Sequence, residues 1–149
     1  WFLVERMRPQ DAQQRIPLKA RIGTSQPKLI EAVTLMETNL EEPLSPDDLA
    51  YHVGLSRRHL ERLFKKHLDS VPSRFYLQLR LDKARQMLRD TDRSIVEVGM
   101  ACGFSSASHF STTYRTHFNL TPRQERGRAT HVESAPSWTH SVAIQRRLD

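Results

Sequence analysis

The side chains best suited to recognise a ligand lie in "SRRHLERLFKKHL", residues 56–68, where five Lys and Arg residues are interspersed with apolar ones. Arg can bind two acceptors of guanine at once, and Glu can accept a hydrogen bond from cytosine. We therefore predict that Arg58, Glu61 and Arg62 contact bases. Phosphate contacts, which give affinity without sequence choice, are assigned to Arg57, Lys65, Lys66 and Arg74.

A second stretch, "SASHFSTTYRTHF" at residues 106–118, has the same apolar spacing but little charge. Small hydroxyl side chains bind phosphates or base edges with little discrimination, and Ala can contact a thymine methyl. The predicted base contacts here are Ala107, Ser108 and Thr112, and the predicted phosphate contacts are Ser106, His109, Arg115 and Arg123, with Arg126 as a further candidate. We expect weaker sequence choice from this stretch than from residues 56–68.

Both assignments have ordinary alternatives. The net charge of +6 is uneven: residues 28–55 carry −5, residues 56–89 carry +7 and residues 105–128 carry +3. A basic block is either a solvated surface or a docking surface for a polyanion. Similarly, Glu61 either accepts a hydrogen bond from a base or forms an i,i+4 ion pair with Lys65.

The remaining reactive side chains indicate structural roles. Histidines occur at positions 52, 59, 67, 109 and 117 without the paired spacing of metal ligands, and structural roles are favoured for them. Cys102 precedes a glycine at a helix end and is expected in the core, as are Met36, Met87 and Met100. The sequence has no phosphate-binding glycine loop, nucleophile elbow or paired catalytic carboxylates, so neither enzyme activity nor a metal or cofactor is expected.

The elements that position these residues are predicted to be short, well-capped helices. Apolar spacing and Pro27 favour a first helix over residues 27–40. Serines followed by helical patterns predict helix starts, and glycines predict left-handed helix ends. The predicted starts are Ser45, Ser56, Ser94 with Glu97 as a capping box, and Thr121 with Gln124 at a last short helix. The predicted ends are Gly54 and Gly103, and a longer helix is predicted over residues 72–89. Two helices joined by a tight glycine turn form a helix-turn-helix pattern.

The two stretches are copies of one pattern. With an offset of fifty, Leu60 matches Phe110 and Phe64 matches Tyr114; His59, His67, Leu68 and Pro72 also match His109, His117, Phe118 and Pro122. Asp69 and Asn119 share a slot just past the helix end, where a positive φ is expected. Upstream the offset becomes forty-nine, pairing Gly54 with Gly103. We predict an all-α fold of about seven helices, with helix-turn-helix units at about 44–71 and 94–120 joined by a long linker helix.

Composition bounds the rest of the chain. The 38% hydrophobic content suits a modest helical core, and no run of eighteen apolar residues could span a membrane. A single cysteine agrees with a reducing cytoplasm. Because the chain starts at Trp1 and residues 1–27 have scattered charge and prolines, we expect a linker there after an upstream domain. The domain itself is expected at 28–127, and residues 128–149 are expected to be a disordered tail.

Residues 28–127 resemble the DNA-binding domain of AraC/XylS-type transcription regulators. The resemblance rests on the S-x-x-x-L-x-R-x-F run at 56–64, on "RLDKARQML", and on "CGFSS" with "SHFS". It implies two recognition helices in successive major-groove segments of one DNA face, and it places base contacts at Arg58, Glu61 and Arg62. Members commonly have Arg or Lys at the slot held by Thr112, so the sequence departs from the pattern there.

The resemblance also implies partners. A regulator of this kind, expected to be an activator, would bind a promoter operator in double-stranded DNA, contact RNA polymerase and dimerise in the cytoplasm. "QQRIPLKARIG" is similar to the linker of the subgroup whose upstream domain resembles class I glutamine amidotransferases and senses an effector. Members regulate arginine or quaternary-amine catabolism, so a small nitrogenous effector is expected. Two alternatives stay open: an accessory domain of a DNA-repair methyltransferase-like protein, and a helical module that binds a protein partner.

Overall fold

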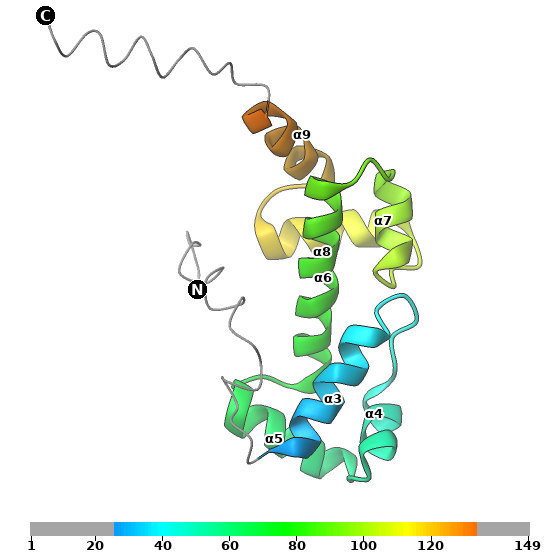
Figure 1. The fold of residues 1–149 in the computed structure, drawn as a ribbon, viewed down its shortest axis with the longest axis vertical. Coiled ribbons are helices and arrows are strands. Elements are labelled where there is room, and N and C mark those ends of the chain that lie inside the picture. Colours follow the sequence, from blue (N-terminus) through cyan, green and yellow to red (C-terminus); the bar gives the residue numbers. More distant parts are fainter. Residues whose placement is uncertain (1–25, 134–149) are drawn as a thin grey trace, which may run out of the picture. The chain divides into compact units, whose positions relative to one another are not determined.

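The computed structural model describes residues 26–133, and all regular structure within this range is helical (Figure 1). The helices are α3 Pro27–Thr38, α4 Pro46–Val53, α5 Arg57–Leu68, α6 Pro72–Asp90, α7 Ile95–Ala101, α8 Ala107–Phe118 and α9 Pro122–Glu133. The predicted all-α class with seven helices is confirmed. None of these helices is long and apolar enough to cross a membrane.

Local side-chain chemistry explains where the helices start. A serine hydroxyl accepts a hydrogen bond of 3.1 Å from the amide three residues later at four helix starts, namely Ser45, Ser56, Ser94 and Ser106. At α9, Thr121 and Gln124 bind each other's backbone amides at 2.9 and 3.1 Å, which is a complete capping box. Each serine cap contributes about 1 kcal/mol. The predicted helix starts at Ser45, Ser56, Ser94 and Thr121 are therefore confirmed, and the cap at Ser106 adds one that the sequence analysis did not name.

Positive φ angles end the helices of both repeats. Gly54 and Gly103 have φ of +72° and +85° in the turns after α4 and α7. Asp69 and Asn119 have φ of +49° and +63° after α5 and α8. Short polar side chains tolerate this left-handed conformation better than other non-glycine residues. The matched slots of the sequence repeat therefore have the same backbone conformation.

The described residues fall into two compact units whose boundary lies within α6, between Leu79 and Arg80. The first unit contains α3, α4, α5 and the start of α6. Its core includes Leu29, Met36, Leu49, Leu60 and Phe64, all at most 1% exposed. Tyr76 of α6 donates a hydrogen bond to the Asn39 carbonyl and accepts one of 3.1 Å from the Leu44 amide. This tyrosine thereby fixes the loop between α3 and α4 against α6.

The second unit contains the rest of α6 with α7, α8 and α9. Its core includes Leu81, Ala84 and Leu88 of α6, Val98 and Cys102 around α7, and the rings of Phe104, Phe110 and Tyr114. The Phe110 and Tyr114 rings meet edge to face, with centroids 5.8 Å apart. This unit therefore buries more aromatic area on α8 than the first unit does on α5, where the equivalents are Leu60 and Phe64.

The structure extends the repeat beyond the two helix-turn-helix units. At an offset of fifty-two, Leu29, Ala32 and Met36 of α3 match Leu81, Ala84 and Leu88 of α6, and all six are buried. Each unit is therefore a three-helix set followed by the start of a fourth helix. This part of the repeat is not evident in the sequence, because the loop before α7 is three residues shorter than the loop before α4 and the offset changes from fifty-two to forty-nine.

Three expectations need correction or fall outside the described residues. Met100 is 60% exposed and not part of the core, whereas Met36 is fully buried as predicted. Helix α9 continues to Glu133, beyond residue 127 where the sequence analysis ended the domain and began a disordered tail. The expected linker and most of the expected tail, residues 1–25 and 134–149, lie outside the described residues.

Gly99 of α7 lies in close contact with Phe110 of α8. A Cβ at this position would lie 2.9 Å from Cδ2 and 3.1 Å from Cγ of Phe110. At the matching position in the first unit, Ala50 is accommodated, and the residue in place of Phe110 is Leu60. The larger side chain, Phe110, thus packs against the smaller residue, Gly99, whereas Leu60 in the first unit is matched with Ala50.

We expect Gly99→Ala to lower the free energy of unfolding by about 1–3 kcal/mol, because the new methyl forces the Phe110 ring to shift in a close-packed core. Phe110→Leu should remove most of this penalty, so the two changes should be non-additive. Urea unfolding of the single and double variants measures the effect. Ala50→Gly is the matched control in the first unit, with an expected loss of about 1 kcal/mol from helix propensity. Additive effects at positions 99 and 110 would contradict this account.

Candidate nucleic-acid interface

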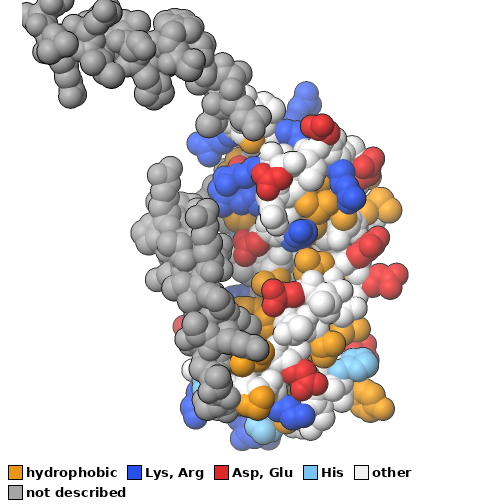
Figure 2. Space-filling view, in the orientation of Figure 1, with side chains coloured by type: hydrophobic (Ala, Val, Ile, Leu, Met, Phe, Trp, Pro, Cys, Tyr) orange, Lys and Arg blue, Asp and Glu red, His pale blue; other side chains and the backbone are white. Residues whose placement is uncertain are grey.

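Helix α5 presents a basic face opposite its buried one. Leu60 and Phe64 are fully buried, whereas the predicted contacts Arg58, Arg62 and Lys66 are exposed. On the face drawn in Figure 2, Lys, Arg and His side chains gather at the foot of the view, where α5 lies in Figure 1. Since Ser56 caps the helix, Arg58, Glu61 and Arg62 occupy its amino-terminal half. This is the part of a recognition helix that meets base edges.

Ion pairs organise the acidic and basic residues of this face. Glu61 binds Arg57 at 3.0 Å, and Arg57 also lies 3.5 Å from Asp47 of α4. Lys65 binds Asp69 at 2.9 Å, so the Glu61–Lys65 pair that the sequence left open does not form. The hydrogen bond from Lys65 lowers the pKa of Asp69, and the hydrogen bond to Glu61, followed by the charge of Asp47, raises that of Arg57.

These pairs change the expectation for Arg57. Its guanidinium is already engaged by two carboxylates, so a phosphate would have to compete with Asp47 and Glu61. Arg57 instead links α4 to α5 and holds Glu61 in one direction. Because all three side chains are between 44% and 71% exposed, the pairs contribute little to stability. Their effect is on the orientation of the Glu61 carboxylate.

Helix α8 presents a small, uncharged face. The predicted contacts Ala107, Ser108 and Thr112 are all exposed. The hydroxyl of Ser106 is used as the helix cap, where it accepts from the His109 amide, and the His109 ring packs 5.5 Å from the centroid of Phe104. The remaining predicted phosphate contacts, Arg115 and Arg123 in this unit and Arg74 in the first, are exposed. Exposure leaves these three arginines available to a ligand.

Arg126 has a different role from the one expected. Its Nε donates to the Leu88 carbonyl at 3.2 Å and its Nη2 to the Thr91 carbonyl at 3.3 Å, at the end of α6. It matches Tyr76 of the first unit at an offset of fifty, and Thr91 matches Asn39 at fifty-two. Both side chains fix the loop after the first helix of their unit. Arg126 is therefore a structural residue.

Arg80, Arg85 and Arg89 of α6 were absent from the sequence predictions, which named only Arg74 in this helix. Arg80 donates to the carbonyls of Cys102 and Gly103 at 2.7 and 2.8 Å, and its guanidinium lies 4.4 Å from the Phe104 ring centroid. These bonds satisfy carbonyls at the end of α7, which a helix end leaves without intrahelical partners. Arg80 thus holds the turn that precedes α8. The one indication of this residue in the sequence is the repeat itself: at an offset of fifty-two, Arg80 matches Lys28, which is also basic.

The histidines and the cysteine do not form a reactive site. Residues 26–133 contain no group of three His, Cys, Asp or Glu side chains that could hold a metal ion. His52, His59, His109 and His117 are exposed and His67 is half-buried, so four of these five histidines are not core residues. Cys102 is fully buried, as predicted, with its sulfur 3.9 Å from that of Met87. Burial raises the pKa of its thiol to about 11, despite the opposing charges of Arg80 and Lys83.

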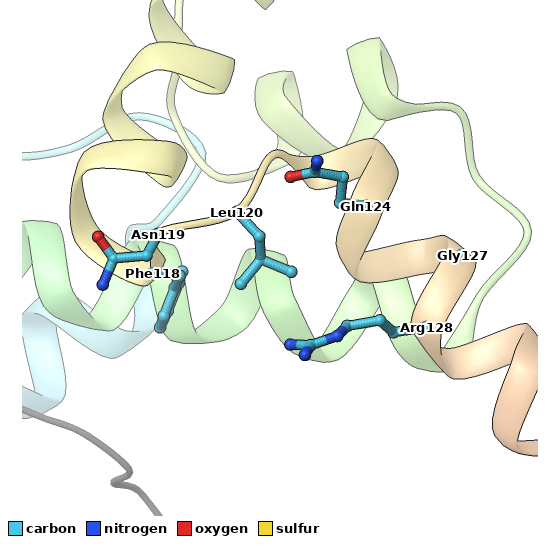
Figure 3. Close-up of a pocket in the computed structure, with 6 residues that line it drawn as sticks. All are labelled: Phe118, Asn119, Leu120, Gln124, Gly127 and Arg128. Atoms are coloured by element: carbon cyan, nitrogen blue, oxygen red, sulfur yellow. The ribbon is translucent and has the colours of Figure 1, made fainter.

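An open hollow lies where α8 passes into α9 (Figure 3). It has a volume of about 620 Å³ and is lined by Phe118, Asn119, Leu120, Gln124, Gly127 and Arg128. None of the predicted DNA-contact residues lines it. The exposed faces of α5 and α8, and not this hollow, are therefore the candidate site.

Two successive helix-turn-helix units with an exposed second helix in each define a helix-turn-helix DNA-binding domain. A family model described as a helix-turn-helix domain matches residues 49–128. The crystal structure of an AraC-type transcriptional regulator from Chromobacterium violaceum shares 67% identity with a TM-score of 0.68, over 70% of this chain and 94% of that chain. The chain belongs to the AraC family of transcription regulators.

Two further likenesses bear on the site and on the extent of the chain. The HTH-type transcriptional regulator ArgR of Pseudomonas aeruginosa is 57% identical over 125 residues, which cover 84% of this chain and 38% of that protein. The DNA-binding domain of AdpA, solved in complex with a target DNA, is 28% identical with a TM-score of 0.64, over 67% of this chain and 90% of that chain. This chain thus spans well under half the length of the relative it matches.

We expect the thiol of Cys102 to react slowly in the folded chain. With a pKa of about 11, the thiolate fraction at pH 8 is about one in a thousand, and burial further limits access. Reaction with a disulfide reagent at pH 8 should be at least about a hundredfold slower than in urea-unfolded protein, and should still accelerate with pH above 9. Equal rates in folded and unfolded chains would instead indicate an accessible thiol, as a methyltransferase-like protein requires.

Proposed function

We propose that this domain binds a specific double-stranded DNA site with α5 and α8 as its two recognition helices. Arg58, Glu61 and Arg62 read bases from α5, and Ala107, Ser108 and Thr112 do so from α8. Phosphates are bound by Lys65, Lys66, Arg74, Ser106, His109, Arg115 and Arg123, with Arg57 as a weaker contributor. The observation that carries the proposal is the exposed arginine pair in the amino-terminal half of α5, opposite the buried Leu60 and Phe64.

The two helices contribute unequally to sequence choice. Arg58 and Arg62 can each bind guanine through two hydrogen bonds, a contact worth about 1–3 kcal/mol of discrimination. In α8 the proposed base-contacting side chains, Ala107, Ser108 and Thr112, are exposed but too small to form such contacts. Two major-groove segments one helical turn apart, about 34 Å, would give each domain an asymmetric site of roughly two turns. One half of this site is strongly specified and the other weakly.

The rest of the protein carries the other functions of a regulator. We propose an activator that dimerises and contacts RNA polymerase in the cytoplasm, with an amidotransferase-like domain upstream that senses a small nitrogenous effector. Control of arginine or quaternary-amine catabolism follows from the resemblance of the linker residues. The likeness to ArgR over 84% of this chain supports a shared mode of DNA binding. It supports the remaining assignments less directly, because that match covers 38% of the relative.

Selection of bound sequences from random double-stranded DNA tests the asymmetry. We expect one cluster of strongly preferred base pairs, including guanines, and a second, weaker cluster about ten base pairs away, because the two helices would enter successive turns of the same groove. The information content at each position measures this difference. Two equally specified half-sites, or no preference at all, would contradict the proposal.

Arg62→Ala should weaken binding to the selected site by about 1–3 kcal/mol and relax preference at one or two base pairs. Lys66→Ala is the matched control, since loss of a phosphate contact should weaken binding to specific and random DNA alike. It should also reduce the slope of log binding constant against log salt concentration by about one. Binding titrations at several salt concentrations measure both effects. Base reading by Arg62 would be ruled out if Arg62→Ala weakened specific and random DNA equally. Salt-independent association without base-pair preference would favour the protein-binding alternative.

A further inference from the structure

Glu125 of α9 is the one charged side chain that is buried among the described residues, with 2% of its surface exposed. The Tyr114 hydroxyl donates to its Oε1 at 2.7 Å, and Arg85 Nε forms an ion pair with the same oxygen at 2.8 Å. Arg89 donates to Oε2 from Nη2 at 3.2 Å and Nε at 3.3 Å. Both carboxylate oxygens are thus bound, and the set of Glu125, Arg85, Arg89 and Tyr114 is called the polar anchor below.

The first unit has apolar residues at three of the four positions of the polar anchor, and the exposed Glu37 matches Arg89 at an offset of fifty-two. Tyr114 matches Phe64 and Glu125 matches Phe75 at an offset of fifty, and Arg85 matches Val33 at fifty-two. Phe64 and Phe75 meet edge to face with ring centroids 5.6 Å apart, and Val33 is buried in the same core. The same three-helix arrangement therefore forms without any charge at these three positions.

Stability alone does not account for the polar anchor. Removing ionised groups from water is costly, and a well-packed apolar set of similar volume is often as stable as a buried ion pair. What the polar groups add is direction, because hydrogen bonds require defined angles whereas apolar surfaces can slide. Burial, then the hydrogen bond to Glu125, raises the pKa of Tyr114, so this hydroxyl remains protonated and continues to donate.

The polar anchor joins α8 to two other helices. Tyr114 lies at the middle of α8 on its buried side, Arg85 and Arg89 belong to α6, and Glu125 belongs to α9. Arg85 also lies 4.8 Å from the ring centroid of Phe118, at the end of α8. The rotation of α8 about its own axis is therefore fixed at two points, and this rotation decides where Ser108 and Thr112 point.

We propose that Glu125 is a positioning residue of the second recognition helix. By binding Tyr114, Arg85 and Arg89 it sets the orientation of α8, and thereby the affinity of α8 for its DNA segment, without contacting DNA. Because the contacts of α8 are small side chains with short reach, they depend on this orientation more than the long arginines of α5 do. The inference rests on the proposed function, since it requires that α8 meets DNA.

The test transplants the apolar residues of the first unit into the second, as the triple variant Arg85→Val, Tyr114→Phe and Glu125→Phe. Circular dichroism and urea unfolding establish that it folds. Glu125→Gln is a milder variant, which keeps an acceptor for Tyr114 but removes the charge that binds the arginines. Glu97→Gln, at an exposed residue of α7, is the matched control for loss of a negative charge.

Affinity is measured for the selected DNA site and for the same site with the α8 half scrambled. We expect the triple variant to bind the intact site about threefold more weakly, which is less than the loss of one good bidentate base contact because the side chains of α8 are small, and the scrambled site as wild type does. Glu125→Gln should show a smaller loss of the same kind, and Glu97→Gln none. Amide exchange should become faster in residues 107–118 and stay unchanged in residues 57–68.

Three results would overturn the inference in distinguishable ways. If the folded triple variant matches wild type on both DNAs, Glu125 is not a positioning residue while the proposed function stands. Equal weakening on both DNAs would indicate a general structural role for the polar anchor. If wild type itself binds both DNAs equally, α8 does not read DNA, and the proposed function of this helix fails together with the inference. Should the triple variant not fold, the same comparisons apply to Glu125→Gln.

Discussion

Each helix-turn-helix unit depends on the burial of one aromatic ring at the middle of its second helix. Phe64 in α5 and Tyr114 in α8 are fully inaccessible to solvent. Burying such a side chain contributes about 1.5–3 kcal/mol, a large share of the stability of a small unit. The ring also decides which side of the helix faces inward. Exposure of Arg58 and Arg62, or of Ser108 and Thr112, follows from where that ring sits, so the core of each unit determines the surface it can offer to DNA.

The parts of the fold that local chemistry determines could be predicted from the sequence. Serine caps, left-handed ends at Gly54, Asp69 and Asn119, and the buried faces of α5 and α8 all depend on residues within one or two helical turns of each other. The exposed faces of α5 and α8 follow from the same periodicity. Met100 was misplaced because a seven-residue helix packs along one narrow strip, and apolar character alone does not say which residues lie on that strip.

Interactions between distant residues could not be predicted in this way. Arg126 looked like a phosphate ligand because a lone arginine near a basic stretch resembles a surface charge, yet it binds carbonyls thirty-five and thirty-eight positions away. Glu61 offered two intrahelical partners, Arg57 and Lys65, and periodicity does not choose between them. Lys65 pairs with Asp69, which is also four residues away, and Asp47 of the preceding helix provides a second carboxylate beside Arg57. Competition among several possible partners therefore decided the pairing.

The polar anchor also bears on how two unlike halves could arise from one ancestral unit. An isolated carboxylate in an apolar core is costly, so a glutamate at position 125 would have been poorly tolerated while position 85 still held a residue such as valine. Arginine at position 89 carries no such penalty, because its side chain is 45% exposed and can reach water. Arginine at position 89 is therefore the substitution that the fold tolerates first, and glutamate at position 125 is tolerated only when the arginines are already present. With the carboxylate buried, loss of either arginine would leave its charge less compensated, so converting the second unit to the apolar set of the first requires more than one substitution.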